Sequence, residues 1–255
     1  NCIDLIPYLE DNSVSLCLCS PPYAEQRKSL YGGVPERQYP DFTTMWMQRL
    51  KRKLSPNGSV LIVIDPHVKS GVLSDYVLKT ELALRKDGWV PHQTQIWLKR
   101  DRGPLGHSQW PRHCYEQILW FSKTARPYCA PRTNGKLTDH LTMNNYVHSR
   151  WTNGGKPGKN GVARVTNVWD IPVGGNSSNV DHPAKFPIAL PKAMIPTFCP
   201  PGGVVLDNFA GSGSTLLAAK ELGRYYIGFD IMSEYVELAN KRLEEVDPSS
   251  IPKAG

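Results

Sequence analysis

A strand, a glycine-rich turn and a helix follow one another between residues 204 and 222, and this unit constrains the fold more than any other stretch. The run Val204-Val205-Leu206-Asp207 predicts a short buried strand, and the glycines after it let the chain turn into an apolar helix that ends before Gly223. A second apolar run, Tyr225 to Phe229, follows the helix and ends at Asp230. Two strands joined by a helix form a βαβ unit, which predicts parallel strands in an α/β sheet.

The glycine turn has the features of a nucleoside site. Glycine lets the backbone approach a ligand closely, and an acid ~20 residues downstream, here Asp230, can bind both hydroxyls of a ribose. No lysine precedes Ser214 or Thr215, which excludes a phosphate-binding P-loop, and the three-glycine dinucleotide spacing is incomplete. The pattern therefore favours a cofactor with a ribose but no pyrophosphate, while glycines that serve only tight packing stay an alternative.

A second strand stops at Ser20-Pro21-Pro22-Tyr23. The run from Ser13 to Leu18 predicts a buried strand, and the two prolines cannot continue its hydrogen bonds because they lack an amide hydrogen. The turn that follows presents a hydroxyl, a backbone carbonyl and an aromatic ring. Open α/β sheets place their chemistry at such carboxyl strand ends, so this turn is the candidate catalytic site.

Helices and strands alternate through most of the chain, which at 255 residues is long enough for one large α/β domain with an insertion. Residues 1–10 read as a short mixed segment, and Pro56-Asn57-Gly58 is typical of a turn. The strands at 89–98 and 117–121 are candidates for an antiparallel hairpin in a mainly parallel sheet. Further helices are predicted at 42–54, 74–86, 188–198 and 233–245, and a further strand at 59–64.

Residues 123–166 interrupt this alternation and are strongly basic. Apolar periodicity is nearly absent, and the segment contains a single acid, Asp139. Its basic residues are Lys123, Arg126, Arg132, Lys136, Arg150, Lys156, Lys159 and Arg164. Together with the formal charge of +7 and an isoelectric point near 9.1, the segment favours an anionic partner such as nucleic acid. A solvated surface loop stays the alternative.

The remaining composition argues against several other kinds of site. The six cysteines form no Cys-x-x-Cys pair, so we expect neither a structural metal nor a disulfide, as in a reducing intracellular compartment. His67, His107, His113 and His182 share no metal spacing. No apolar run approaches the ~18 residues that span a bilayer. Because the chain does not begin with methionine, we expect its natural amino end to lie upstream.

Two of the motifs resemble those of a known family. Ser20-Pro21-Pro22-Tyr23 and Phe209-Ala210-Gly211-Ser212-Gly213 are similar to the catalytic and cofactor motifs of the amino-methylating DNA methyltransferases. Three further stretches match in order, namely Glu116 to Lys123, His182 to Pro187, and Gly228-Phe229-Asp230. The order of catalytic motif, insertion and cofactor motif resembles the β class, a circular permutation of the S-adenosylmethionine-dependent fold.

The resemblance implies an α/β fold, a Rossmann-like class I methyltransferase fold with a mainly parallel sheet, circularly permuted and carrying a loop-rich target-recognition insertion. It divides the chain into a catalytic half at 1–122, the insertion at 123–166, a cofactor-binding half at 167–246 and a flexible tail at 247–255. Asn208 stands where the family usually has proline, and asparagine tolerates unusual dihedral angles. We therefore expect a modest change in loop rigidity.

The resemblance also implies roles for single residues. Ser20 and Pro21 offer oxygen atoms to the target amine, Pro22 stiffens the turn, and Tyr23 stacks on the base. The implied cofactor is S-adenosyl-L-methionine, and its implied contacts are Lys185, Phe186, Asp207, Phe209, Gly211, Gly213, Ser214, Thr215 and Asp230. The implied DNA contacts are Arg132, Lys136, Arg150, Lys156, Lys159 and Arg164.

The serine of the catalytic motif bears on the target base. In this family Ser-Pro-Pro-Tyr accompanies cytosine-N4 methylation more often than adenine-N6 methylation, which favours a flipped-out cytosine of double-stranded DNA. An adenine-N6 enzyme, an inactive DNA-binding relative, and an RNA or protein methyltransferase stay alternatives. Carbon-5 methylation is disfavoured because no Pro-Cys motif is present. We expect a monomer or homodimer without metal or membrane, in the cytoplasm or nucleoid if bacterial or from a phage and in the nucleus if eukaryotic.

Overall fold

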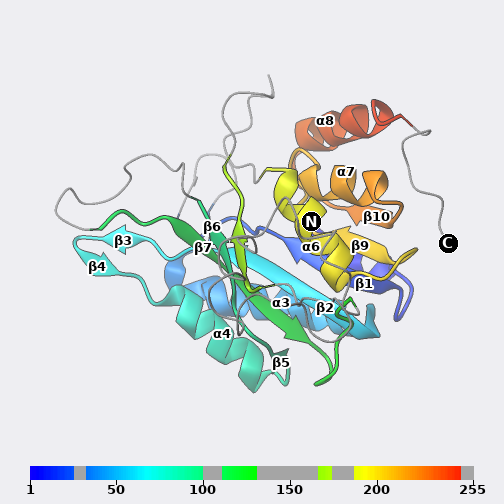
Figure 1. Cartoon of the computed structure of the whole chain (residues 1–255). Coiled ribbons are helices and arrows are strands. Elements are labelled where there is room, and N and C mark those ends of the chain that lie inside the picture. The colour runs from blue at the N-terminus through cyan, green and yellow to red at the C-terminus, as the bar shows by residue number, and fades with distance from the viewer. Residues whose placement is uncertain (26–32, 100–110, 131–165, 174–186, 248–255) are drawn as a thin grey trace, which may run out of the picture.

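The structure, a computed structural model, describes residues 1–25, 33–99, 111–130, 166–173 and 187–247. Within these residues an eight-stranded sheet is covered by helices on both faces (Figure 1). Its strand order is β10-β9-β1-β2-β7-β6-β8, with β5 paired to β7. The strands are β1 (Val14–Cys19), β2 (Leu54–Ile64), β5 (Val90–Pro91), β6 (Gln95–Leu98), β7 (Tyr115–Ser122), β8 (Val168–Asp170), β9 (Val204–Asp207) and β10 (Tyr225–Gly228).

Parallel pairing joins the strands that carry the two predicted motifs. β1 pairs in parallel with β2 and with β9, and β9 pairs in parallel with β10. β7 runs antiparallel to β2, β5 and β6, so the predicted antiparallel hairpin is confirmed for β6 and β7. A largely parallel sheet with helices on both faces is the predicted α/β, Rossmann-like architecture.

Two helical layers enclose the sheet (Figure 1). α1, η1, α3 and α4 cover one face, and α6 and α7 cover the other, with α8 packed on α7. β1 is buried on both sides, because Leu16 and Leu18 contact the layer of α6 and α7 while Cys17 and Cys19 contact that of α3. The helices are α1 (Cys2–Leu5), η1 (Ile6–Tyr8), η2 (Glu36–Gln38), α3 (Tyr39–Lys51), α4 (Tyr76–Lys86), α6 (Ala189–Phe198), α7 (Ser214–Glu221) and α8 (Ser233–Glu244), and a small hairpin joins β3 (Val68–Lys69) to β4 (Val72–Leu73).

Residues 1–10, predicted as a short mixed segment, contain the helical turns α1 and η1, with Asn1 capping the first through its side chain. Two expectations about later segments were wrong. β2 begins before the predicted turn, and residues 55–58 bulge out of it, since Val14 lies opposite Leu54 while Leu16 lies opposite Ser59. The predicted strand at 89–98 is two strands, β5 and β6, because the chain leaves the ladder between Pro91 and Gln95.

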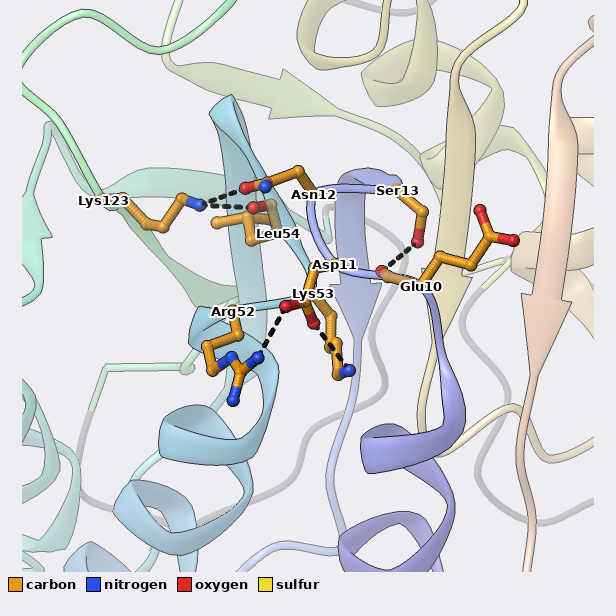
Figure 2. Close-up of polar contacts among 8 residues, drawn as sticks. All are labelled: Glu10, Asp11, Asn12, Ser13, Arg52, Lys53, Leu54 and Lys123. Atoms are coloured by element: carbon orange, nitrogen blue, oxygen red, sulfur yellow. Dashed lines mark hydrogen bonds and ion pairs between the residues drawn. The ribbon is translucent and has the colours of Figure 1, made fainter.

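A polar cluster ties three segments together at the amino ends of β1 and β2 (Figure 2). The Asp11 carboxylate accepts hydrogen bonds from Arg52 and Lys53, each at 2.8 Å, and so joins the end of α3 to the turn before β1. Lys123, directly after β7, donates to the Asn12 side chain at 3.1 Å. The cluster lies at the edge of the sheet opposite the predicted catalytic turn. It therefore stabilises the packing of α3, β1 and β7 and does not contribute to the candidate site.

The chain stays attached to the framework beyond β7. The amide of Tyr128 donates to the carbonyl of Asn57 at 2.7 Å, and that of Ala130 donates to the carbonyl of Thr197 at 2.8 Å. The predicted insertion therefore begins with a segment that is hydrogen-bonded to β2 and to α6. Its boundaries at 123 and 166 stay a prediction, because residues 131–165 lie outside the described residues.

Candidate functional site

The two predicted motifs lie at neighbouring strand ends. In the parallel ladder Cys17 of β1 lies opposite Leu206 of β9, and Ile227 of β10 lies opposite the same Leu206. The three strands therefore end at one edge of the sheet, where the catalytic turn follows Cys19 and the glycine loop follows Asp207. Such an edge is where α/β folds of this type bind their ligands.

The catalytic turn follows β1, in which every residue except Ser15 is buried. Cys19 and Pro21 are buried, whereas Ser20, Pro22 and Tyr23 are half-buried and so are placed between the core and the surface. The Ser20 hydroxyl offers lone pairs to a donor, as does the carbonyl of Pro21. This combination can accept two hydrogen bonds from one amino group.

Tyr23 is held through its hydroxyl, which donates to Glu116 Oε2 at 2.7 Å. Burial, and next the negative charge of Glu116, raise the pKa of Tyr23 well above its ordinary value. The phenol therefore stays protonated at working pH. Tyr23 can supply a ring face but not a base, and its one hydroxyl proton is donated to Glu116.

Two glycines of the cofactor loop adopt left-handed backbone conformations. Gly211 has a φ of 50° and Gly213 a φ of 81°, values that L side chains rarely adopt. At Gly213 an added Cβ would also lie 2.9 Å from Cβ of Ala239 in α8. Tight packing, the alternative explanation for these glycines, thus accounts in part for glycine at position 213. At position 211 the reason for glycine is the positive φ of the turn.

Asp230 is fixed by two backbone amides. Its Oδ2 accepts from the Gly211 amide at 2.8 Å and its Oδ1 from the Met232 amide at 2.9 Å. Each carboxylate oxygen keeps a further lone pair, so the oriented carboxylate can still accept from two ribose hydroxyls. A loop with two glycines beside a fixed carboxylate fits the nucleoside part of S-adenosylmethionine.

Asp207 and Phe209 shape the base of the loop. Asp207 is 2% exposed, and its Oδ1 accepts from the Phe209 amide at 3.0 Å. Burial raises the pKa of Asp207 to about 7, although that amide hydrogen bond opposes the shift. The Phe209 ring packs on Trp46 and Phe42 of α3, with centroids 5.7 and 6.0 Å away. Ser214 and Thr215 are buried at the start of α7, directly after the loop.

Asn208, the departure from the family pattern, is buried at 2% exposure. Its Oδ1 accepts from the Cys17 thiol at 3.4 Å, a contact between the cofactor loop and the strand that leads to the catalytic turn. This hydrogen bond links β1 to the residue after β9, and the expected change in loop rigidity stays a prediction.

Sequence reasoning missed four polar residues at the same edge, Asp65, Lys99, His113 and Glu116. Glu116 accepts from Lys99 Nζ as well as from Tyr23, and Asp65 Oδ1 lies 2.8 Å from His113 Nε2. For His113 the sequence indicated only that it shares no metal spacing with the other histidines. Asp65 and Lys99 directly follow β2 and β6, so the rule that singled out the strand end at Ser20 could have found both.

The other predicted contacts fall outside the described residues. They are Lys185 and Phe186 for the cofactor and Arg132, Lys136, Arg150, Lys156, Lys159 and Arg164 for DNA. In the part of the chain that the structure describes, no three His, Cys, Asp or Glu side chains are grouped for a metal ion. In the same ranges no helix is both long and apolar enough to cross a membrane.

Comparison with known proteins places this geometry in context. A family model described as DNA methylase matches residues 14–241. Type II methyltransferase M.HpaI of Haemophilus parainfluenzae is 28% identical, over 96% of this chain and 72% of its own. The solved structure of PvuII DNA methyltransferase (cytosine-N4-specific) has a TM-score of 0.72 at 24% identity, covering 96% of this chain and 84% of its own. The M1.HpyAVI–SAM complex has a TM-score of 0.65 at 19% identity, covering 95% of both chains.

Proposed function

This chain belongs to the N6/N4 DNA methylase family, which makes it an S-adenosylmethionine-dependent amino-methyltransferase of DNA, and from that premise we propose that it methylates the exocyclic N4 amine of cytosine. The observation that carries the proposal is Ser20 at the end of β1, one strand from the cofactor loop after β9. The likeness to PvuII DNA methyltransferase, which is cytosine-N4-specific, supports it.

The reaction has to overcome the weak nucleophilicity of the amine. The lone pair of an exocyclic nitrogen is delocalised into the base ring, and hydrogen bonds from its two N–H groups draw it toward sp³ geometry. We assign these hydrogen bonds to the Ser20 hydroxyl and the Pro21 carbonyl. S-adenosylmethionine, when bound, would supply the methyl group, whose bond to sulfur breaks as the bond to the amine nitrogen forms. The thioether then leaves, and one amine proton passes to solvent during or after the attack. No covalent bond to the protein is needed, so positioning is the main catalytic contribution and can lower the barrier by ~7–11 kcal/mol.

The cofactor assignment rests on the loop after β9. We infer that Asp230 binds the ribose hydroxyls and that Gly211 and Gly213 leave room for the ligand beside the backbone. We propose Asp207, Phe209, Ser214 and Thr215 as further contacts of the cofactor, as the family resemblance implies. Lys185 and Phe186 are proposed as further cofactor contacts from the sequence pattern alone.

The substrate assignment rests on the basic insertion. A base inside a duplex cannot reach a buried turn, so the target nucleotide must be flipped out at a cost of a few kcal/mol. We propose that Arg132, Lys136, Arg150, Lys156, Lys159 and Arg164 offset this cost through contacts with the phosphates of double-stranded DNA. The division into two methyltransferase halves and an insertion is part of the same proposal.

Transfer of labelled methyl groups tests the proposal. The chain is incubated with unmethylated DNA and tritiated S-adenosylmethionine, the DNA is digested to nucleosides, and the label is followed by chromatography. We expect label in N4-methylcytosine, and we expect Ser20→Ala to remove most of it while keeping cofactor affinity. Label in N6-methyladenine would overturn the base assignment. Cofactor binding without transfer to any DNA would identify an inactive relative.

A further inference from the structure

A buried ion pair lies directly behind Tyr23 of the catalytic turn. The Tyr23 hydroxyl donates to Glu116 Oε2 at 2.7 Å, and Glu116 Oε1 accepts from Lys99 Nζ. The side chains of Lys99 and Glu116 are only 7% and 8% exposed. A continuous set of charge-assisted contacts therefore runs from the interior of the protein to the catalytic turn.

The sheet fixes both ions. Glu116 lies in β7 opposite Trp97 of β6, and Lys99 is the residue after β6. Lys99 Nζ lies 3.9 Å from the centroid of the Trp97 ring, whose indole N–H donates to the Ile171 carbonyl at 2.7 Å. Because backbone pairing and these contacts hold the ion pair in place, the hydroxyl of Tyr23 is tied to a rigid point.

Stability alone does not account for this pair. Desolvation of two buried charges offsets most of their attraction, and an apolar pair of similar volume serves a fold as well. What the apolar pair lacks is an oxygen that can accept a hydrogen bond from the Tyr23 hydroxyl. The useful property of the pair is thus the contact that Glu116 makes with the catalytic turn.

We propose that Lys99 and Glu116 are positioning residues, which hold the Tyr23 ring in the orientation that stacks on the flipped base. Lys99 holds the Glu116 carboxylate in one place, and Glu116 in turn fixes the Tyr23 hydroxyl. This inference rests on the proposed function only in that it needs a methyl-transfer reaction at a flipped base. It does not depend on which base is methylated.

A double-mutant cycle in the full chain tests the inference. Tyr23→Phe keeps the ring and removes its hydroxyl, while the paired replacement Lys99→Met/Glu116→Leu removes the acceptor without leaving one buried charge unpaired. We expect each to lower the single-turnover rate of transfer about tenfold, with the cofactor Kd unchanged. The combined variant is expected to be no slower than either, because both changes remove the same contact.

A matched control distinguishes positioning from general damage to the core. Gln95 is another buried polar residue of β6, but its side chain accepts from the Trp169 indole and not from Tyr23. We expect the factors by which Gln95→Met and Tyr23→Phe each change the single-turnover rate to multiply in the combined variant, because the two residues act independently. The inference would be overturned if the rate losses of Lys99→Met/Glu116→Leu and Tyr23→Phe also multiplied, so that the combined variant transferred methyl groups about a hundredfold more slowly than the wild type. If the paired replacement does not fold, Glu116→Gln takes its place in the cycle, with a smaller expected coupling.

A readout without catalysis separates this inference from the proposed function. Tyrosines are replaced by 3-fluorotyrosine, and the ¹⁹F resonance of residue 23 is assigned from its loss in Tyr23→Phe. We expect Lys99→Met/Glu116→Leu to shift and broaden that resonance, and Gln95→Met to leave it unchanged. An unmoved resonance overturns the inference, whereas an adenine product in the transfer assay overturns only the base assignment.

Discussion

The buried carboxyl of Asp207 predicts an unusual dependence of stability on pH. Its pKa is raised from 3.8 to about 7 by burial, a shift of ~3 units. In the unfolded chain this group is ionised above pH ~4, whereas in the folded protein it keeps its proton up to about pH 7. The folded state thus binds more protons between these values, so stability falls as the pH rises through that window.

The size of the effect follows from the shift. Each pKa unit corresponds to ~1.4 kcal/mol, so the loss between pH 5 and pH 8 is ~3 kcal/mol. Asp207→Asn removes the ionisation and keeps an oxygen that can accept from the Phe209 amide. We therefore expect the free energy of unfolding of Asp207→Asn, relative to the wild type, to rise by about this amount over the same interval.

Urea unfolding at pH 5, 6, 7 and 8 measures the difference, which should grow up to pH ~7 and then level off. Asp11→Asn is the matched control. Asp11 is exposed, and hydrogen bonds from Lys53 and Arg52 lower its pKa, so its contribution is lost only at pH values below 3.8. Parallel curves for wild type and Asp207→Asn between pH 5 and pH 8 would refute a raised pKa at Asp207.

Three further predictions concern the cofactor loop and the insertion. Asp230→Ala should weaken cofactor binding in calorimetry at least tenfold, because one hydrogen bond to a charged group contributes ~1.5–3 kcal/mol; an unchanged Kd removes the ribose assignment. Gly213→Ala should lower Tm more than Gly202→Ala, since both positions have positive φ but only Gly213 faces Ala239. Only Gly213→Ala should also weaken cofactor binding, and equal effects of the two would contradict the loop's role. Lys156→Gln/Lys159→Gln should reduce the salt slope of DNA binding by ~2; an unmoved slope would show that these lysines do not contact phosphates.

The sequence predicts well what is encoded locally. The Pro-Pro pair ends β1 because proline cannot extend a ladder, and Gly211 has the backbone conformation for which glycine is suited. Asp230 lies two residues after β10, at the edge where the pattern predicted it. The roles of these residues in binding and catalysis stay predictions, since they follow from family resemblance.

What the sequence did not reveal depends on pairing between distant segments. Pro56-Asn57-Gly58 has the residues of a turn. However, β1 pairs with β2 on both sides of this segment, so the segment forms a bulge within β2. Glu116 and Lys99 contact each other only because β6 and β7 pair in one register. No local pattern indicates that register, and neither residue was singled out as part of the site.

The central claim is transfer of a methyl group to cytosine N4 with the help of Ser20. Its most direct test is mass spectrometry of genomic nucleosides from a methylation-deficient bacterial host that expresses the chain. We predict N4-methylcytosine in cells with the wild-type chain and its near absence in cells with equal amounts of Ser20→Ala. N6-methyladenine in place of N4-methylcytosine, or equal N4-methylcytosine in both strains, would contradict the account.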